Sequence, residues 1–350
     1  MQYSRLGNTG LIVSRLAFGA MTFGTDSRFP SVTKVDMNGA RTLVSKSLEA
    51  GINFFDTADG YGQGQSETML GELLRDRRQD VVIATKVGFR SGEPMTQSGL
   101  SRRHILASCD ASLKRLRTDY IDLYIVHRED RYTTLHETLE ALNDLVRAGK
   151  VRYIGYSNWS AWKAAAGFRI QNERAWAKFT SGQMYYSLLG RDVEHEVVPF
   201  MRYHGLGMTV WSPLAGGFLS GKYTRAKPKG DSGDRLGGFD FLPYDRERGY
   251  QLVDLLHGIA ARRGVSVAQV SLAWLLTRPT VSSLLVGASS VKQLEDNLGA
   301  TQVKLDAEDL AQLDAATQPT IPYPQWFTVR VADSKVHEAL GIPQAHPAVR

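Results

Sequence analysis

Eight short runs of apolar and β-branched residues recur along the chain, separated by longer stretches with apolar residues at helical spacing. Several runs are apolar almost throughout, as is typical of parallel strands that are covered on both faces. Strands alternating with helices predict a parallel sheet, and eight such units favour a closed (β/α)8 TIM barrel. The predicted strands cover 16–19, 53–56, 81–86, 121–127, 151–157, 180–183, 208–211 and 284–286.

The intervening stretches carry the end signals of helices. Thr134 and Glu137 have the spacing of a capping box, and Gly51 and Gly149 stand where helices over 39–50 and 135–148 would end. A doubly wound open sheet fits the same periodicity. No G-x-G-x-x-G turn follows the first predicted strand, and this favours the barrel.

Three segments fall outside the eight units, within what we expect to be a single domain over 1–350. Residues 1–15 predict a β-hairpin that turns at 7–10. Residues 216–246, after strand seven, are rich in Gly, Lys, Arg and Pro and predict a long functional loop. The tail over 319–350 is expected to pack as an irregular segment.

Composition narrows the class of protein. The 350 residues are 43% hydrophobic and 22% charged, and the net charge of +6 is scattered along the chain, which indicates solvated helix faces and no nucleic-acid surface. No stretch reaches the roughly 18 apolar residues of a membrane span, and the start has no signal-peptide pattern. The single cysteine, Cys109, cannot form an internal disulfide, lies on an apolar helical stripe and is expected in the core. A cytoplasmic protein is predicted, and a homo-oligomer is compatible with the sequence.

Polar side chains stand where the apolar runs stop, strand after strand. Because a parallel barrel places its active site at the carboxyl ends of the strands, such residues gather into one site. The residues concerned are Asp56 with Tyr61 after strand two, Lys86, His127, Ser157 with Asn158, Gln183, and Trp211 with Ser212.

Four of these residues can support the reduction of a carbonyl group. Hydride transfer leaves an alkoxide that needs a proton, and Tyr61 can donate it if the ammonium of Lys86 lowers its pKa. Asp56 can hold Lys86 in place, and His127 can orient the carbonyl oxygen. Taken singly, each has an ordinary interpretation: a barrel ion pair, a packing tyrosine, a core histidine. Their joint occurrence favours the site. No second histidine or cysteine stands at ligand spacing near His127, so a metal site is not expected.

The residues after strands seven and eight indicate an anionic cofactor. Gly216 and Lys222 allow a close approach of backbone and a cation to phosphate, and Trp211 can stack on a nicotinamide ring. Ser157, Asn158 and Gln183 can hold the carboxamide. The turn from Gly287 leads into a helix start, which is a common phosphate position in barrels and also a plain N-cap.

These segments resemble the aldo-keto reductase superfamily. The matching motifs are G-I-N-F-F-D-T-A-D-G-Y-G from Gly51, the T-K pair ending at Lys86, D-Y-I-D-L-Y-I-V-H ending at His127, G-K-V-R-Y-I-G-Y-S-N ending at Asn158, Q-M-Y-Y-S-L from Gln183, and W-S-P-L-A-G-G-F-L-S-G-K ending at Lys222. They occur in the family's order and cover most of residues 1–318.

The resemblance implies a catalytic tetrad of Asp56, Tyr61, Lys86 and His127, with Tyr61 as the proton donor, and NADP(H) as the cofactor. It implies cofactor contacts by Ala20, Met21, Asp56, Ser157, Asn158, Gln183, Trp211, Ser212, Pro213, Leu214, Gly216, Lys222, Arg235, Gly287, Ser289, Gln293, Asp296 and Asn297. The branch that includes potassium-channel β subunits carries matches to Lys222 and Arg235. Those subunits lack the histidine found here at His127.

One departure concerns the cofactor. Many family members have an arginine or lysine where this chain has Ser289, so the preference for NADP(H) over NAD(H) depends on Lys222 and Arg235. We predict that Arg235 replaces the missing cation and that NADPH is preferred.

The leading hypothesis is an enzyme that reduces aldehydes or ketones, or oxidises the corresponding alcohols. The expected pocket walls are Met21, Tyr61, Phe89, His127, Arg128 and Trp159, with Trp326 from the tail. Arg128 can receive an anionic group or pair with Glu129 or Asp130. A cofactor-binding regulatory or scaffold subunit with slow turnover is the alternative. A barrel hydrolase would need paired carboxylates or a metal site, neither of which the sequence offers.

Overall fold

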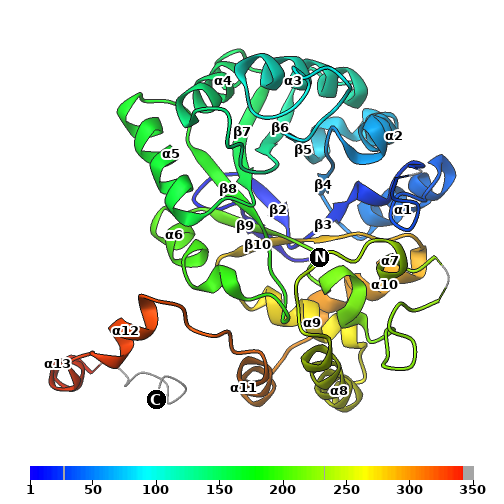
Figure 1. The fold of residues 1–350 in the computed structure, drawn as a ribbon. Coiled ribbons are helices and arrows are strands. Elements are labelled where there is room, and N and C mark those ends of the chain that lie inside the picture. The colour runs from blue at the N-terminus through cyan, green and yellow to red at the C-terminus, as the bar shows by residue number, and fades with distance from the viewer. Residues whose placement is uncertain (27, 232, 342–350) are drawn as a thin grey trace.

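A computed structural model describes residues 1–26, 28–231 and 233–341, and its centre is a closed barrel of eight parallel strands (Figure 1). The strands pair in chain order, and the last closes on the first. They are β3 (Leu16–Gly19), β4 (Phe54–Asp56), β5 (Val82–Val87), β6 (Ile121–Val126), β7 (Val151–Ser157), β8 (Phe179–Tyr185), β9 (Gly207–Trp211) and β10 (Val281–Val286). The predicted (β/α)8 barrel is confirmed, and the doubly wound alternative is wrong.

Helices surround the barrel (Figure 1). The α-helices are α1 (Met37–Glu49), α2 (Gln65–Leu73), α3 (Arg102–Leu116), α4 (Leu135–Arg147), α5 (Ala161–Glu173), α6 (Val197–Tyr203), α7 (Arg235–Gly238), α8 (Arg246–Arg263), α9 (Val267–Leu276), α10 (Val291–Gly299) and α11 (Ala307–Ala316). Short 3-10 turns are η1 (Ala20–Thr22), η2 (Tyr61–Gly64), η3 (Arg75–Asp80), η4 (Asp192–Glu194), η5 (Ala215–Ser220) and η6 (Ala300–Gln302). No helix within the described ranges has the length and apolar character needed to cross a membrane.

Helix α4 shows how one predicted cap differs in the structure. The hydroxyl of Thr134 accepts a hydrogen bond from the backbone N–H of Glu137, as a capping box requires. The carboxylate of Glu137 does not accept the backbone N–H of Thr134, which would complete the capping box. It accepts the backbone N–H of Arg102 at 2.9 Å and so ties α4 to the start of α3.

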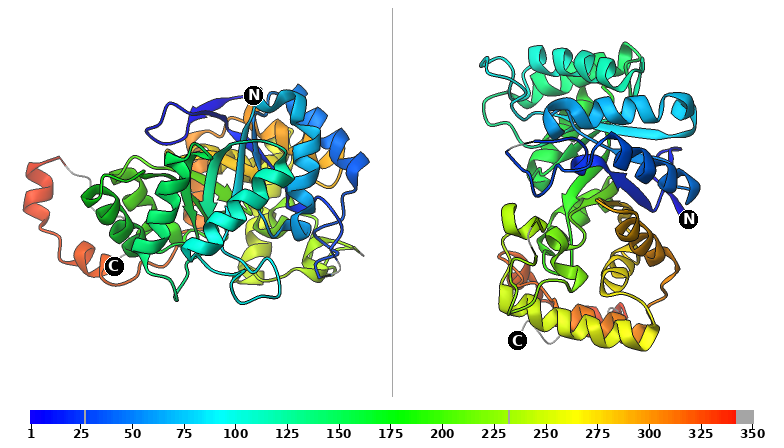
Figure 2. Two further views of the ribbon diagram at one scale, coloured as in Figure 1. Left: turned by 90° about the horizontal axis from the view of Figure 1, so that it is seen from above. Right: turned by 90° about the vertical axis from the view of Figure 1, so that its right-hand side faces the viewer.

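The amino-terminal hairpin closes one end of the barrel. Strands β1 (Tyr3–Arg5) and β2 (Ile12–Ser14) pair antiparallel, as predicted, and lie at the opposite end from the long loop after β9 (Figure 2). The turn at Gly7 is so close to β9 that a Cβ there would lie 2.5 Å from the backbone nitrogen of Gly207. The carboxyl ends of the strands therefore remain free to form a site at the other end.

The core has two parts. Apolar side chains such as Phe54, Leu123 and Ile125 fill the barrel, and a larger cluster lies between the strands and the helices. Cys109 belongs to the larger cluster, and burial raises its pKa to about 12, which confirms its prediction as a core residue.

Helices α2 and α3 meet at a glycine without room for a side chain. A Cβ on Gly71 would lie 2.5 Å from the carbonyl carbon of Leu116 and 2.6 Å from the carbonyl oxygen of Arg115. Because these are backbone atoms, Gly71→Ala is expected to lower the free energy of unfolding by about 1–3 kcal/mol, measured by urea denaturation. Gly258→Ala on α8 is the control: its Cβ would meet only the end of Arg262, and alanine should stabilise the helix slightly. Equal stability of Gly71→Ala and wild type would contradict this packing.

The tail differs from its prediction as an irregular, packed segment. It contains the two short helices α12 (Gln325–Arg330) and α13 (Ser334–Ala339), and it extends away from the barrel (Figure 1). Tyr323 and Phe327 remain exposed because few barrel side chains face the segment. Residues 342–350 of the predicted tail lie outside the described residues.

Candidate active site

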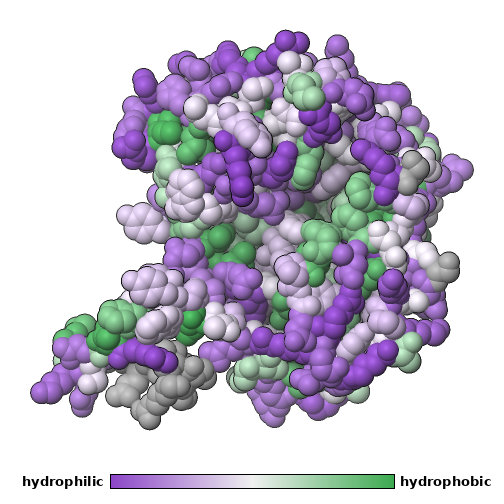
Figure 3. Space-filling view, in the orientation of Figure 1, coloured by the Kyte–Doolittle hydropathy of each residue, from purple (hydrophilic) through white to green (hydrophobic). Residues whose placement is uncertain are grey.

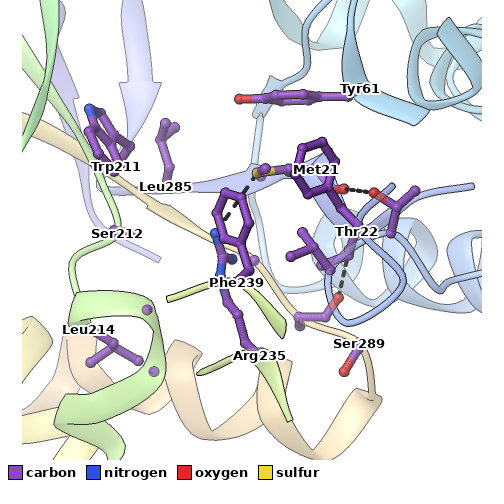
Figure 4. A pocket seen from close by; sticks show the side chains of 18 of the residues that line it. Met21, Thr22, Tyr61, Trp211, Ser212, Leu214, Arg235, Phe239, Leu285 and Ser289 are labelled. Carbon is purple, nitrogen blue, oxygen red and sulfur yellow. Dashed lines mark hydrogen bonds between the residues drawn. The ribbon is translucent and has the colours of Figure 1, made fainter. Parts of the chain in front are cut away.

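A cavity of about 1010 Å³ lies at the carboxyl ends of the strands, where the sequence predicted the site. It appears as a hollow in the middle of this face (Figure 3), and its walls come from both the barrel and the loops around it (Figure 4). All the predicted cofactor residues except Ala20 line this cavity. The backbone carbonyl of Ala20 accepts the hydroxyl of Ser66, and its side chain is fully buried.

A buried ion pair lies at the floor of the cavity, which Asp56 lines and behind which Lys86 is enclosed. Nζ of Lys86, at 0% side-chain exposure, lies 2.5 Å from Oδ1 of Asp56 and donates to the carbonyl of Thr57 at 2.7 Å. The second carboxylate oxygen of Asp56 accepts the side-chain amide of Gln183 at 2.9 Å. Burial lowers the pKa of Lys86, but the charges of Asp56 and Tyr61 outweigh burial and raise it overall. The lysine is therefore held as an ammonium.

Tyr61 lies directly above this ion pair at the start of η2. Nζ of Lys86 donates to the phenol oxygen at 3.4 Å and lies 4.8 Å from the ring centre. Burial raises the pKa of Tyr61 above its ordinary value, while Lys86 and, less strongly, Arg235 act to lower it. The predicted lowering by Lys86 is present, but the net shift is upward because desolvation is the larger effect. Tyr61 is therefore a protonated donor at neutral pH.

His127 lies beside Tyr61, directly after β6. The two rings meet edge to face with centres 5.8 Å apart, and Phe89 packs on the histidine at 4.6 Å. Burial, and then the charges of Lys86 and Arg128, hold the pKa of His127 well below its usual value. The imidazole is therefore neutral and can donate a hydrogen bond to a neutral carbonyl oxygen without competing for the proton.

A hydrogen-bond network follows the ends of β7, β8 and β9. Ser157 Oγ donates to the carbonyl of Gln183 at 2.8 Å, and Nδ2 of Asn158 donates to Ser157 Oγ and to the carbonyl of His127, each at 3.0 Å. The indole N–H of Trp211 donates to Oδ1 of Asn158 at 3.0 Å. Asn158 has a left-handed backbone conformation with φ +56°, and the hydrogen bonds join the ends of the three strands into one fixed wall.

The turn after β9 exposes backbone and a cation. Gly216 and Gly217 have φ of +70° and +94°, which bring the turn close to the cavity without side chains. Nζ of Lys222 lies 2.6 Å from Oδ1 of Asp234. A phosphate at this turn would therefore share Lys222 with a carboxylate.

Arg235 enters the cavity from α7. One guanidinium nitrogen lies 3.9 Å from the sulfur of Met21, the carbon lies 5.3 Å from the centre of Phe239, and Nε is buried without a hydrogen-bond partner among residues the structure describes (Figure 4). Burial lowers the pKa of Arg235. It has no carboxylate partner there, in contrast to Lys222, so its charge is available to an anion.

The start of α10 closes the far end of the cavity. The backbone N–H and hydroxyl of Ser289 both donate to Oε1 of Gln293, at 2.9 and 3.1 Å. Asp296 accepts hydrogen bonds from Ser266 and Gln269, which fix its carboxylate. Ser289, Gln293 and Asn297 therefore offer neutral polar groups to the cavity at the start of α10, and a cation there would have to come from another element.

Three expected pocket residues lie elsewhere. Trp159 is buried at 2% exposure against Tyr156 and Phe179, so it does not line the cavity. Arg128 is exposed, with its guanidinium 5.1 Å from the centre of Phe89, and it forms an ion pair with neither Glu129 nor Asp130. Trp326 lies in the tail, and the residues that line the cavity do not include it.

Sequence reasoning missed the lining contributed by the loop between β3 and α1. Phe29 meets Phe239 edge to face at 5.4 Å, and Lys34 donates to the carbonyl of Gly233, so this loop packs on the long loop after β9. Phe241 stacks on Trp211 with an angle of 7° between the rings. The basic and aromatic residues of both loops were the available signal, but neither loop has a period that predicts which side chains face inward.

Asp59 is a buried carboxyl behind the site. It is 5% exposed and lies near Glu67, whose carboxylate pairs with Arg115. Burial first, and then Glu67, raise the pKa of Asp59 from 3.8 to about 7. Folding therefore stabilises the protonated form, and the carboxyl is neutral in mildly acidic solution.

Asp59→Asn is expected to change how stability depends on pH. In the wild type the pKa of Asp59 is about three units higher in the folded state than in the unfolded state. The free energy of unfolding therefore falls by about 4 kcal/mol as the pH rises from about 4 through 7. The neutral amide removes this loss, so the variant should be the more stable protein at pH about 8 and match the wild type only near pH about 3, below both pKa values, measured by urea denaturation. The exposed Asp119→Asn is the control. A parallel pH profile for wild type and Asp59→Asn would contradict the prediction.

Comparison with known proteins agrees with this geometry. The model of the aldo/keto reductase family matches residues 15–318. A relative in Oryza sativa subsp. japonica, named "Probable voltage-gated potassium channel subunit beta", is 37% identical over 91% of this chain and 97% of its own. The Bacillus subtilis "Uncharacterized oxidoreductase YrpG" is 37% identical over 90% and 95%, and the "Versiconal hemiacetal acetate reductase" of Aspergillus parasiticus 34% over 93% and 99%.

The chain belongs to the aldo/keto reductase family. The family and its oxidoreductase-named relatives place it among the oxidoreductases that act on carbonyl groups, a class that uses nicotinamide cofactors.

Proposed function

We propose that this protein reduces an aldehyde or ketone to an alcohol with NADPH, with Tyr61 as the proton donor. The observation that carries the proposal is the contact of Tyr61 with a buried, charged Lys86, beside a neutral His127 and at the end of a long cavity. A structural ion pair alone would not need a phenol and an imidazole on its cavity side.

The cavity residues fit a nicotinamide dinucleotide. The wall of Ser157, Asn158 and Gln183 offers amide and hydroxyl groups that suit the carboxamide, beside the indole of Trp211. The glycine turn and Lys222 suit the pyrophosphate. The buried Nε of Arg235 lacks a partner, and an additional phosphate of NADP(H) would supply one.

When bound, the reduced nicotinamide supplies a hydride to the carbonyl carbon. Tyr61 donates its proton to the oxygen that becomes negative, and Lys86 stabilises the phenolate that remains. Asp56 and Thr57 hold the ammonium in place. His127 orients the carbonyl oxygen, and its neutral form leaves Tyr61 as the acid.

The substrate end of the cavity is apolar and aromatic. Phe89 lines it, packed against His127 and beside Tyr61. An aromatic or small aliphatic aldehyde suits these walls.

A cofactor-binding subunit with slow turnover is the competing function, because a relative named as a probable voltage-gated potassium channel subunit beta matches most of the chain. A single-turnover experiment separates the two. The bound NADPH is mixed with an activated aromatic aldehyde, and its absorbance and the alcohol product are followed. Rapid oxidation with stoichiometric alcohol supports the reductase, whereas NADPH that stays bound and reduced would overturn it.

Arg235→Ala is expected to weaken NADPH binding selectively. We estimate a loss of about 1.5–3 kcal/mol, or about 10-fold to 100-fold in Kd, because a charged hydrogen bond to phosphate is removed. NADH lacks that phosphate, so its Kd should change little. Fluorescence titration of both cofactors measures the difference, with the exposed Arg103→Ala as the control. Equal losses for NADPH and NADH would show that Arg235 does not discriminate between them.

A further inference from the structure

A second cavity lies at the opposite end of the barrel from the active site. It has a volume of about 330 Å³ and is formed where the hairpin meets the turn after α6 and the turn before β10. Figure 2 shows the hairpin at this end, away from the loops of the active site. The family's chemistry at the carboxyl ends of the strands makes no use of it.

The charge of this cavity is positive and uncompensated. Arg5 and Arg202 are the ionisable residues in its lining, which contains no carboxylate. Neither guanidinium forms an ion pair or hydrogen bond within the described chain, although many arginines elsewhere in the molecule do. Two free guanidinium forks on one cavity are an arrangement that suits an oxyanion.

A buried hydroxyl in the same wall also lacks a partner. Thr280 is 8% exposed, and its Oγ1 is buried with no hydrogen-bond partner among the residues described. Buried polar atoms in folded proteins are normally paired. The oxygen is closed to solvent in this conformation, and a rotation of the Thr280 side chain would turn it to the cavity, where a bound acceptor would satisfy it.

The frame of the cavity is fixed by hydrogen bonds. Ser282 Oγ donates to the carbonyl of Arg5 at 3.0 Å, which anchors the end of β1 to β10. The backbone N–H of Asn8 donates to the carbonyl of Gly205 at 2.8 Å. Gly205 has φ +67°, and a Cβ there would clash with Nδ2 of Asn8, so a larger residue would displace Asn8. The two arginines therefore project from rigid backbone.

We propose that this cavity binds the phosphate group of a small molecule. A carboxylate has two oxygens, whereas the two arginine forks and the hydroxyl offer more donors than two oxygens can accept in good geometry. A phosphate presents three or four oxygens and can accept from both arginines at once. The volume exceeds that of one phosphate ion, so it leaves room for the remainder of a phosphate monoester.

Equilibrium dialysis with labelled ligand tests the proposal in the full-length protein with saturating NADPH, which keeps phosphate out of the active-site cavity. One arm uses inorganic phosphate and the other glycerol 3-phosphate. We expect millimolar or tighter binding by the wild type and at least a 10-fold loss in R5Q/R202Q. The matched control R103Q/R147Q removes the same charge from exposed arginines and should bind as the wild type does. Thr280→Val should weaken binding less.

Each outcome has a defined meaning. Tighter binding of glycerol 3-phosphate indicates a phosphorylated metabolite, and tighter binding of phosphate indicates the free ion. Equal binding by wild type and R5Q/R202Q, or no binding across the millimolar range, overturns the proposal. The ligand should also raise the Tm of the wild type and leave the Tm of R5Q/R202Q unchanged. The thermal transition of the variant shows that it is folded, and the unchanged Tm shows that it does not bind the ligand. Carbonyl reduction by R5Q/R202Q should equal that of the wild type, so this test does not depend on the proposed catalytic function.

Discussion

Tyr61→Phe is expected to lower the single-turnover rate of aldehyde reduction by about 100-fold to 10,000-fold, the range that a lost general acid produces. The phenol oxygen is the group nearest to Lys86 on the cavity side, and the variant removes it while keeping the ring. The ring contact with His127 should persist, so NADPH affinity should change little. Stopped-flow absorbance of bound NADPH measures the rate, and fluorescence titration measures the affinity.

Tyr132→Phe is the matched control, because Tyr132 is 98% exposed. Its rate should equal that of the wild type. A Tyr61→Phe protein that reduces aldehyde at the wild-type rate would exclude Tyr61 as the proton donor and leave His127 as the candidate acid. A neutral His127 has little tendency to give up its proton, so we expect no such rescue.

Asp56→Asn is expected to destabilise the protein by about 3–5 kcal/mol, the usual cost of leaving one charge of a buried ion pair unpaired. Lys86 is fully buried, and its ammonium would lose a charged acceptor at 2.5 Å. The double variant Asp56→Asn/Lys86→Met removes both charges and should recover part of the loss. Urea denaturation measures these differences. Both variants should be inactive in the single-turnover assay, so stability and activity separate in the double variant.

Asp110→Asn is the control for an exposed ion pair. Asp110 contacts Lys150 at 2.7 Å, and both side chains are about half exposed. Its removal should cost at most about 1 kcal/mol, because solvent screens the pair. If Asp56→Asn were as mild as Asp110→Asn, then Lys86 would have to be neutral in the folded protein, and its proposed role beside Tyr61 would fail.

The periodicity of the chain predicted each barrel strand to within about three residues at its ends. Apolar runs such as 151–157 match the observed strand because burial on both faces leaves little choice of residue. The convergence of the four proposed catalytic side chains was also predictable, since strand ends converge wherever a parallel barrel closes. Asp56, Lys86 and His127 follow directly from their positions along β4, β5 and β6.

The long loop and the tail were predicted less well. The segment over 216–246 has no period, so the sequence could not show that Arg235 enters the cavity while Lys222 pairs with Asp234. The aromatic residues of the tail suggested packing, but Tyr323 and Phe327 lie exposed on short helices that leave the barrel.

The sequence by itself determined the barrel, the family and the residue types of the candidate site, because these depend on periodicity and on spacing from strand ends. The tertiary structure decided which neighbours share each charge. Packing against Tyr156 and Phe179 placed Trp159 in the core, and burial made the net pKa shift of Tyr61 upward in spite of Lys86. Desolvation and pairing depend on groups that are far apart in the chain, as do the two unpaired arginines at the opposite end of the barrel.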